Sequence, residues 1–249
     1  MTNPGKLTLI QTKQHLGLMM NAVRDYIFPE FTVTPPEASS GEAAAEAAVL
    51  AGGEAAETLA TGLPEIAAAI RDDVEAVMGI DPAAVSREEV VFCYPAVTAM
   101  IHYRTAHLLR NAGIPVIPRM ITEMAHSATG IDINPSARIG KHFAIDHGTG
   151  IVIGETAIIG DNVTIYQGVT LGARNFSHDG EGRPVNIPRH PVIEDDVTIY
   201  SGASILGRVT IGKGSVVGGN VWLTHSVPPF SRIVQGRASE SSFTDGAGI

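Results

Sequence analysis

The chain has 249 residues, enough for one large domain or two modest ones, and its 44% hydrophobic and 17% charged residues are ordinary for a soluble globular protein. The formal charge of −9 disfavours nucleic acid as a partner, and a single cysteine, Cys93, excludes an internal disulfide framework and suits a reducing cytoplasm. No apolar run reaches the roughly 20 residues of a membrane span, and the amino terminus lacks the apolar core of a secretory signal, so we expect a cytoplasmic protein without a membrane partner.

Residues 1–129 carry helical signals and predict an α-helical N-terminal domain. Apolar residues three and four apart mark one helix face over residues 66–78. The sequence Ser-Arg-Glu-Glu at 86–89 is a capping box that predicts a helix start, and a further helix is predicted over 94–111. Residues 40–61 are rich in Ala, Gly and Glu, which is compatible with short helices or a linker.

Residues 130–235 repeat a different pattern, in which a large aliphatic residue recurs every six positions and is often followed by glycine. This period fits neither an amphipathic helix, with 3.6 residues per turn, nor a hairpin strand. It predicts a solenoid whose triangular coil uses three hexads, with the aliphatic side chains stacked inside. The repeated residues are Ile153, Ile159, Ile165 and Leu171, then Ile193, Ile199, Ile205, Ile211, Val217 and Leu223.

The repeat breaks at two places, and both contain histidine. Between Ile145 and Ile153 the step is eight residues instead of six, and the extra residues lie around His147. A second interruption inserts a polar loop, residues 174–190, which ends with His190. A functional site has to depart from the pattern that builds only the scaffold, so these two breaks are the candidate functional regions.

Six segments of the chain carry a family resemblance: Asp81-Pro-Ala83, Tyr103-Arg104, Gly-Ile-Asp-Ile-Asn-Pro at 130–135, Ile-Asp-His-Gly-Thr-Gly-Ile-Val-Ile-Gly-Glu-Thr-Ala at 145–157, Gln-Gly-Val-Thr-Leu-Gly at 167–172, and Arg189-His-Pro191. From about residue 65 to residue 230 the sequence resembles bacterial and plant serine acetyltransferases. The resemblance implies an α+β protein, in which an N-terminal α-helical domain precedes a left-handed parallel β-helix of hexapeptide repeats. The left hand comes from the resemblance alone, since general crossover rules favour the right hand.

The resemblance also implies a reaction, the transfer of an acetyl group from acetyl-CoA to the hydroxyl of L-serine, giving O-acetylserine for cysteine biosynthesis. His147 would be the general base and Asp132 would hydrogen-bond it and fix its tautomer. A hydroxyl nucleophile needs such a base, whereas the thioester of acetyl-CoA is already activated, so neither a metal nor a covalent acyl-enzyme is needed.

Substrate binding is assigned by the same resemblance. Asp81 and Asp146 would hold the ammonium group of serine, Arg189 its carboxylate, and His190 would contact serine near the hydroxyl. A zwitterion needs both signs of charge in its pocket, and these residue types supply them. Acetyl-CoA would lie along the later coils, where the small residues permit close approach: Ser201 and Gly219.

Each of these residues also has an ordinary structural explanation when it is taken alone. His147 fits a hydrogen-bonded corner residue, Asp132 a turn-closing residue, and Asp81 a helix N-cap before proline. The arginine and histidine that end the inserted loop fit solvated loop residues. Only the combination of all of them points to a site.

Three other functions are compatible with parts of this sequence. An O-acetyltransferase acting on a sugar or antibiotic would not need a pocket with paired charges. A γ-class carbonic anhydrase would use His142, His147 and a loop histidine as zinc ligands, but the nearby aspartates would then have no role. An inactive scaffold that docks cysteine synthase would not need the polar set that the sequence retains.

The resemblance implies partners as well. Such β-helices assemble as homotrimers or dimers of trimers with active sites between subunits, and relatives bind cysteine synthase through a carboxy-terminal isoleucine, a position that Ile249 matches. Residues 236–249 are rich in Gly, Ser and acidic residues and predict a flexible tail. Inhibition by cysteine, which mimics serine, is a further expectation.

Overall fold

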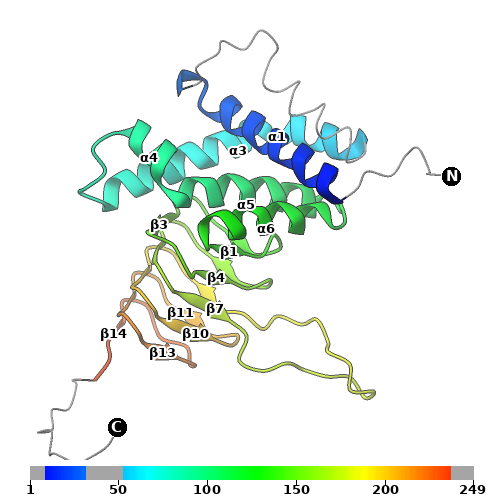
Figure 1. The fold of residues 1–249 in the computed structure, drawn as a ribbon. Helices are drawn as coiled ribbons and strands as arrows, with labels where there is room; N and C mark the ends of the chain where they lie inside the picture. Colours follow the sequence, from blue (N-terminus) through cyan, green and yellow to red (C-terminus); the bar gives the residue numbers. More distant parts are fainter. Residues whose placement is uncertain (1–8, 32–52, 237–249) are drawn as a thin grey trace, which may run out of the picture.

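The computed structural model describes residues 9–31 and 53–236. The predictions for residues 40–52 and for most of the tail, including Ile249, lie outside this part. Within it, helices alone precede the first strand (Figure 1): α1 (Leu9–Ile27), the short 3₁₀ helix η1 (Pro29–Phe31), α3 (Gly53–Ile80), α4 (Arg87–Cys93), α5 (Pro95–Asn111) and α6 (Ile117–Thr129).

The helix starts follow from local chemistry. The side chain of Ser86 accepts a hydrogen bond from the Glu89 amide, at 3.2 Å, and so caps α4 as the sequence predicts. Residues 53–61 do not form a linker, because they belong to the 28-residue helix α3, whose apolar face is buried at Leu59 and Leu63. No helix of the described residues is long and apolar enough to cross a membrane.

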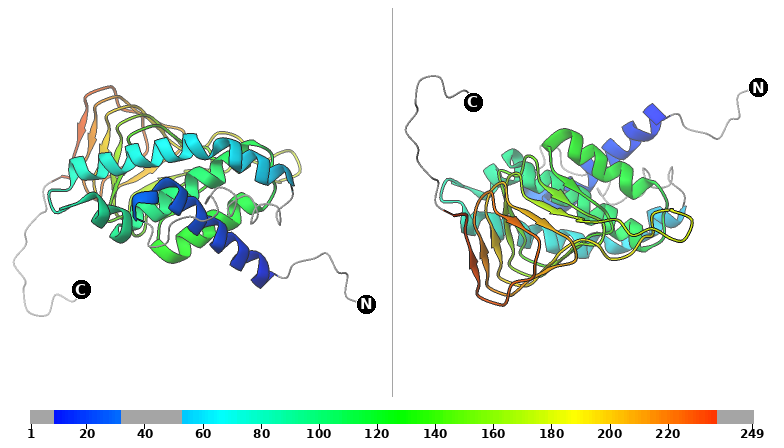
Figure 2. Two further views of the ribbon diagram at one scale, coloured as in Figure 1. Left: turned by 90° about the horizontal axis from the view of Figure 1, so that it is seen from above. Right: turned by 90° about the horizontal axis from the view of Figure 1, so that it is seen from below.

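The second half is a parallel β-helix with three sheets, and the predicted fold class, α-helices followed by a left-handed parallel β-helix of hexapeptide repeats, is confirmed. The coils stack on one another to one side of the helices, below them in the view of Figure 1 and toward the viewer in the right panel of Figure 2. Sheet A contains β1 (Asp132–Ile133), β4 (Val152–Ile153), β7 (Thr170–Gly172), β10 (Ser204–Leu206) and β13 (Trp222–Leu223). Sheet B contains β2 (Arg138–Ile139), β5 (Ile158–Ile159), β8 (Val192–Ile193) and β11 (Thr210–Ile211). Sheet C contains β3 (Ala144–Asp146), β6 (Thr164–Tyr166), β9 (Thr198–Ile199), β12 (Val216–Val217) and β14 (Arg232–Ile233).

The repeated aliphatic side chains fill the interior of the coils. All ten that the hexad pattern selects are buried, and they form one continuous core with the buried face of the helices. Each coil can stack on the next because the strands pair in parallel at the same hexad position, as Val192 does with Thr210. The core therefore runs without a break from the helices through the solenoid.

A buried ion pair joins the helices to the first coil. Arg104 of α5 contacts the carboxylate of Asp73 of α3 at 2.7 Å, and both side chains are about nine-tenths buried. Arg104 also donates to the carbonyl of Gly140 at 2.9 Å, and Asp73 accepts from the amide of Phe143 at 3.1 Å. These contacts thus fix the position of the first coil relative to α3 and α5.

The second interruption of the repeat is a long loop that extends away from the body of the protein (Figure 1). It joins β7 to β8, and its tip is closed by an antiparallel bridge between His178 and Pro184. The chain returns at Arg189 and His190, which are the last residues before the coil resumes.

Candidate active site

The first break in the repeat is a two-residue insertion at the corner where sheet C passes into sheet A, here called the C–A corner. Asp146 still pairs with Tyr166, and beyond the corner the amide of Gly168 bonds the carbonyl of Thr149 at 3.0 Å. Gly150 stands over Gly168, so between the matched positions the first coil has His147, Gly148 and Thr149 where the second coil has Gln167 alone, a difference of two residues. The insertion pushes the histidine outward, and its side chain is 74% exposed.

The backbone of this insertion has the left-handed conformation, with φ of 56° at His147 and 91° at Gly148. A Cβ on Gly148 would lie 2.5 Å from Cδ1 of Ile131 and 2.9 Å from Cγ2 of Ile145. Glycine is needed here both for its φ and for the space, so the exposed imidazole depends on the residue that follows it.

Asp81 and Asp146 flank His147, although they come from different parts of the chain. Asp81 follows α3, and its carboxylate accepts from the Tyr94 hydroxyl at 2.5 Å and from the Ala83 amide at 2.8 Å. These hydrogen bonds, with a smaller contribution from the charge of His147, hold the pKa of Asp81 below its ordinary value. The nearest carboxylate oxygen of Asp146 lies 4.0 Å from Nε2 of His147. One imidazole and two carboxylates therefore share this corner.

Three residues near this corner were missed by the sequence reasoning. Tyr94 is fixed by Asp81, and that hydrogen bond is the main cause that raises the pKa of Tyr94 to about 12. Tyr166 and Tyr200 stack at 5.0 Å in the two coils that follow Asp146. Their spacing matches the coil register, so alignment of the hexads across the inserted loop would have found the pair.

Asp132 lies on β1, and the structure pairs it with a residue outside the predicted set. Nη1 of Arg119, in α6, lies 3.3 Å from Oδ1 of Asp132. The same guanidinium contacts Glu123. The predicted hydrogen bond, in which Asp132 accepts from a ring N–H of His147, stays a prediction.

Arg189 and His190 lie at another corner, where sheet A passes into sheet B, here called the A–B corner. Arg189 pairs with Glu155 at 2.6 Å, and Glu155 stands in the turn between β4 and β5. About six residues of one side of the coil, or roughly 20 Å in an extended chain, separate this corner from the C–A corner. One chain therefore does not bring Arg189 next to His147.

His190 is held in its neutral form. Its Nδ1 accepts a hydrogen bond from the amide of Thr156 at 3.1 Å, so the ring proton is assigned to Nε2. Burial, helped by the charge of Arg189, lowers the pKa of His190 to about 4. The ring lies over Gly154, where a Cβ would come within 2.1 Å of Nε2. His190 is thus a fixed hydrogen-bond donor and a poor base.

The two residues predicted to meet acetyl-CoA stand one above the other at the C–A corner. A Cβ on Gly219 would lie 3.2 Å from the carbonyl oxygen of Ser201, and the amide of Asn220 bonds that carbonyl at 2.8 Å. In the coil above them is Gln167, whose Oε1 is buried without a hydrogen-bond partner among the described residues. Small residues and an unsatisfied acceptor therefore line the edge that begins at His147.

The chemistry of this corner suits acid–base catalysis. An exposed imidazole can exchange a proton with a bound hydroxyl, and two adjacent carboxylates can hold an ammonium group. The carbonic anhydrase alternative finds no support in the arrangement, because His142 stands at a different corner, where it pairs with Asp72 at 3.1 Å. The one cluster of metal-ligating type among the described residues contains neither His142 nor His147.

Comparisons with known proteins agree with this geometry. The family model described as bacterial transferase hexapeptide (six repeats) matches residues 190–225. A protein of Synechococcus elongatus named "Serine acetyltransferase, plasmid" is 51% identical over 79% of this chain, and the match spans 62% of that protein. The serine acetyltransferase of Bacillus subtilis is 43% identical over 66% of this chain and 72% of its own length.

Solved structures give the same result. The native serine acetyltransferase 1 of Entamoeba histolytica has a TM-score of 0.78 and 33% identity, and the match covers 94% of this chain and 90% of that one. A soybean serine acetyltransferase complexed with serine has a TM-score of 0.66 and 28% identity over 88% of this chain and 94% of that one. The isoform 3 enzyme of E. histolytica, solved in complex with cysteine, has a TM-score of 0.78 and 29% identity over 94% of this chain and 95% of that one.

Proposed function

This chain belongs to the serine acetyltransferase family, and from that premise we propose that it transfers the acetyl group of acetyl-CoA to the hydroxyl of L-serine. The product is O-acetylserine, a precursor for cysteine biosynthesis. The observation that carries the proposal is the insertion at the C–A corner, which presents one exposed imidazole beside Asp81 and Asp146. An amino-acid alcohol needs this combination, a base for its hydroxyl and anions for its ammonium group.

The reaction needs one proton acceptor and no covalent enzyme intermediate. His147 takes the proton of the serine hydroxyl while the serine oxygen attacks the thioester carbon of acetyl-CoA. The tetrahedral intermediate then collapses, the carbon–sulfur bond breaks, and the imidazolium returns its proton to the departing CoA sulfur. In this scheme Asp132 orients the imidazole and stabilises its charged form, as a carboxylate does in hydrolase triads.

Serine is held by its two charges. Asp81 and Asp146 receive the ammonium group, Arg189 binds the carboxylate, and His190 donates a hydrogen bond from Nε2–H near the substrate hydroxyl. Because Arg189 and His190 stand at a different corner from His147, a complete pocket requires these two residues from a neighbouring subunit. This separation supports a homotrimer, or a dimer of trimers, with the active sites between subunits.

Acetyl-CoA is proposed to lie along the C–A corner, past Ser201 and Gly219. These residues have little or no side chain, so a long, thin arm can approach the backbone there. No metal takes part in this scheme.

Two regulatory expectations complete the proposal. Cysteine should compete with serine for the same charged groups, and saturating cysteine that leaves the initial rate unchanged would contradict this expectation. Cysteine synthase should bind through Ile249 in a cytoplasmic complex. A pull-down in which deletion of Ile249 changes nothing would rule out this mode of binding.

The decisive experiment measures CoA release from acetyl-CoA with serine, homoserine and a panel of sugars. We expect serine to be the best acceptor, and His147→Ala to lower kcat by roughly two to four orders of magnitude, which is typical for removal of a general base. His142→Ala is the matched control, because His142 is also a corner histidine with a positive φ, 55°. Equal turnover of serine by the parent and the His147→Ala variant would overturn the mechanism.

A further inference from the structure

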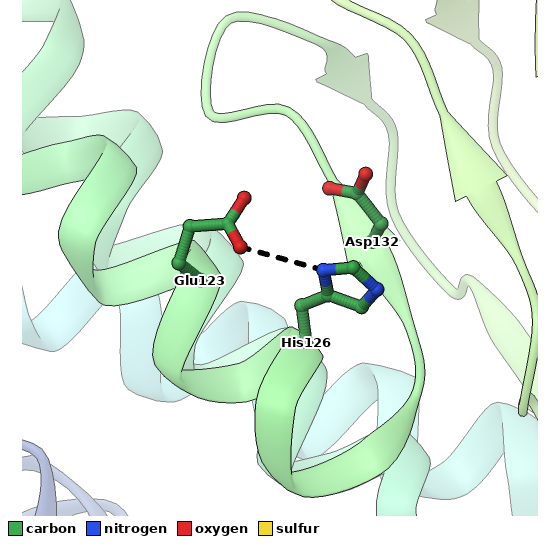
Figure 3. A group of neighbouring side chains, drawn as sticks. All are labelled: Glu123, His126 and Asp132. Carbon is green, nitrogen blue, oxygen red and sulfur yellow. Dashed lines mark hydrogen bonds and ion pairs between the residues drawn. The ribbon is translucent and has the colours of Figure 1, made fainter.

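A second polar cluster lies between α6 and β1. It consists of Glu123 and His126 of α6 and Asp132 of β1, with one potential ligand atom from each residue, all within 4.8 Å of one another. Figure 3 shows the three side chains directed toward a common space between the helix and the strand. Each residue is partly exposed, so an ion can reach the cluster from solvent.

The spacing suits a small divalent transition-metal ion. Nδ1 of His126 lies 3.4 Å from Oε2 of Glu123. Two ligands about 2.0–2.1 Å from a tetrahedral zinc ion are separated by roughly 3.4 Å, so this pair already has the distance that coordination requires. The two residues also form a Glu-x-x-His pair on one helix face, an arrangement that holds metals in helical bundles.

The donor set narrows the class of ion. One imidazole nitrogen and two carboxylate oxygens, from Glu123 and Asp132, suit zinc or cobalt and lack the oxygen-only character that calcium or magnesium prefers. Three protein ligands leave the fourth position open to water.

In the structure a cation already neutralises these carboxylates. The guanidinium of Arg119 contacts both Glu123 and Asp132. Its side chain is 45% exposed, so it can turn into solvent at little cost when a doubly charged ion arrives. Arg119 and a metal ion are therefore alternative occupants of the same place.

We propose that Glu123, His126 and Asp132 bind one divalent transition-metal ion of the zinc class, and that the bound ion inhibits acetyl transfer. The inhibition rests on the proposed function, in which Asp132 orients His147. Coordination draws negative charge from the Asp132 carboxylate toward the ion, so the carboxylate becomes a weaker hydrogen-bond acceptor for the imidazole and stabilises its charged form less; the metal form would therefore have a weaker base.

Binding is tested on the full-length oligomer without substrates. Zn²⁺ is titrated in competition with a chromophoric chelator, and Co²⁺ is followed by its visible absorption. We expect one ion per chain. His126→Gln and Glu123→Gln should each bind the ion roughly ten- to a hundredfold more weakly than the parent, because each removes a ligand. Arg119→Gln should bind it more tightly, because it removes the competing cation. His142→Gln is the matched control, because it removes a half-exposed histidine–carboxylate pair with Asp72 and should bind like the parent. Equal affinity in the parent and His126→Gln overturns the site.

Inhibition is measured separately. Zn²⁺ should lower kcat of the parent with a midpoint equal to its dissociation constant, and chelation should restore the rate. His126→Gln should keep its rate at that Zn²⁺ concentration. One bound ion per chain with an unchanged rate would overturn the link to Asp132. Failure of the proposed function would instead appear without metal, as activity that persists in His147→Ala.

Discussion

Tyr94 donates its hydroxyl proton to Oδ2 of Asp81 across 2.5 Å and so joins the start of α5 to the loop after α3. The hydrogen bond lowers the pKa of Asp81 and raises that of Tyr94 to about 12. Asp81 is proposed to receive the ammonium group of serine. Tyr94 is therefore a positioning residue, which acts through the carboxylate of Asp81.

We expect Tyr94→Phe to raise the KM for serine by roughly fivefold, the scale of one hydrogen bond, with a small change in kcat. The pKa of Asp81 would return toward its ordinary value, so in an acid titration the KM of the variant should begin to rise at a higher pH than that of the parent. Steady-state kinetics at several pH values check both effects. An unchanged KM would remove Tyr94 from the site.

Gly148→Ala should disturb the insertion that exposes His147. The added methyl group would meet Ile131 and Ile145 inside 3 Å, and the residue has a φ of 91°. We expect a loss of roughly 2–4 kcal/mol in the free energy of unfolding and a decrease in kcat of more than about tenfold. Gly113→Ala is the control, because its φ is 83° but its Cβ would meet open space. If both variants behave alike in urea unfolding and in kcat, the packing argument is wrong.

Gly154→Ala should displace the ring of His190. The new Cβ would lie 2.0 Å from Cδ2 of His190, which is well inside contact distance. We predict a decrease in kcat/KM for serine of roughly tenfold or more with the oligomer intact, measured by kinetics and size-exclusion chromatography. Gly180→Ala, in the inserted loop that ends at His190 but with open space around its Cβ, should behave like the parent.

The low pKa of His190 has a consequence for stability. Between its ordinary value of 6.5 and about 4, the unfolded chain takes up a proton at this residue that the folded chain does not. The free energy of unfolding should therefore decrease as pH falls through this window, since the unfolded state binds more protons. In His190→Asn the decrease should be shallower. Parallel urea titrations at pH 7, 6 and 5 would show the difference, and identical slopes would contradict it.

Arg104→Met should destabilise the junction between the helices and the first coil. It leaves the Asp73 carboxylate buried without its cation, a change that costs roughly 3–5 kcal/mol. The double variant Asp73→Asn with Arg104→Met should recover part of this loss, because no buried charge remains. Removal of the exposed pair between Arg87 and Glu75, by Arg87→Met, should change the urea midpoint little.

The fold was predictable because every further hexad in phase with the others independently supports the same solenoid. Each hexad places one aliphatic side chain inside, so a run of them specifies coil, core and register at once. The two breaks were visible for the same reason, and the insertion at His147 follows from a step of eight residues instead of six.

The contacts between separate elements were not predictable in the same way. Tyr94 meets Asp81 and Arg119 meets Asp132 through the packing of helices, and no local period records such contacts. The separation of Arg189 from His147 could have been counted, since the position of each residue within its coil fixes its corner. Residue roles taken from a resemblance do not say whether one chain supplies the whole pocket.

The insertion of His147 and Gly148 lengthens only the first coil. Its strands pair twenty residues ahead, as Arg138 does with Ile158, whereas a coil of three plain hexads pairs at eighteen, as Thr198 does with Val216. Since every rung of a solenoid touches only its two neighbours, rungs added or removed near the carboxyl end would leave the reacting corner as it is. Such edits would alter only the length of edge that a long donor molecule can follow. In this architecture, a protein engineer can change the length of the edge along which the donor lies without changing the corner that contains His147.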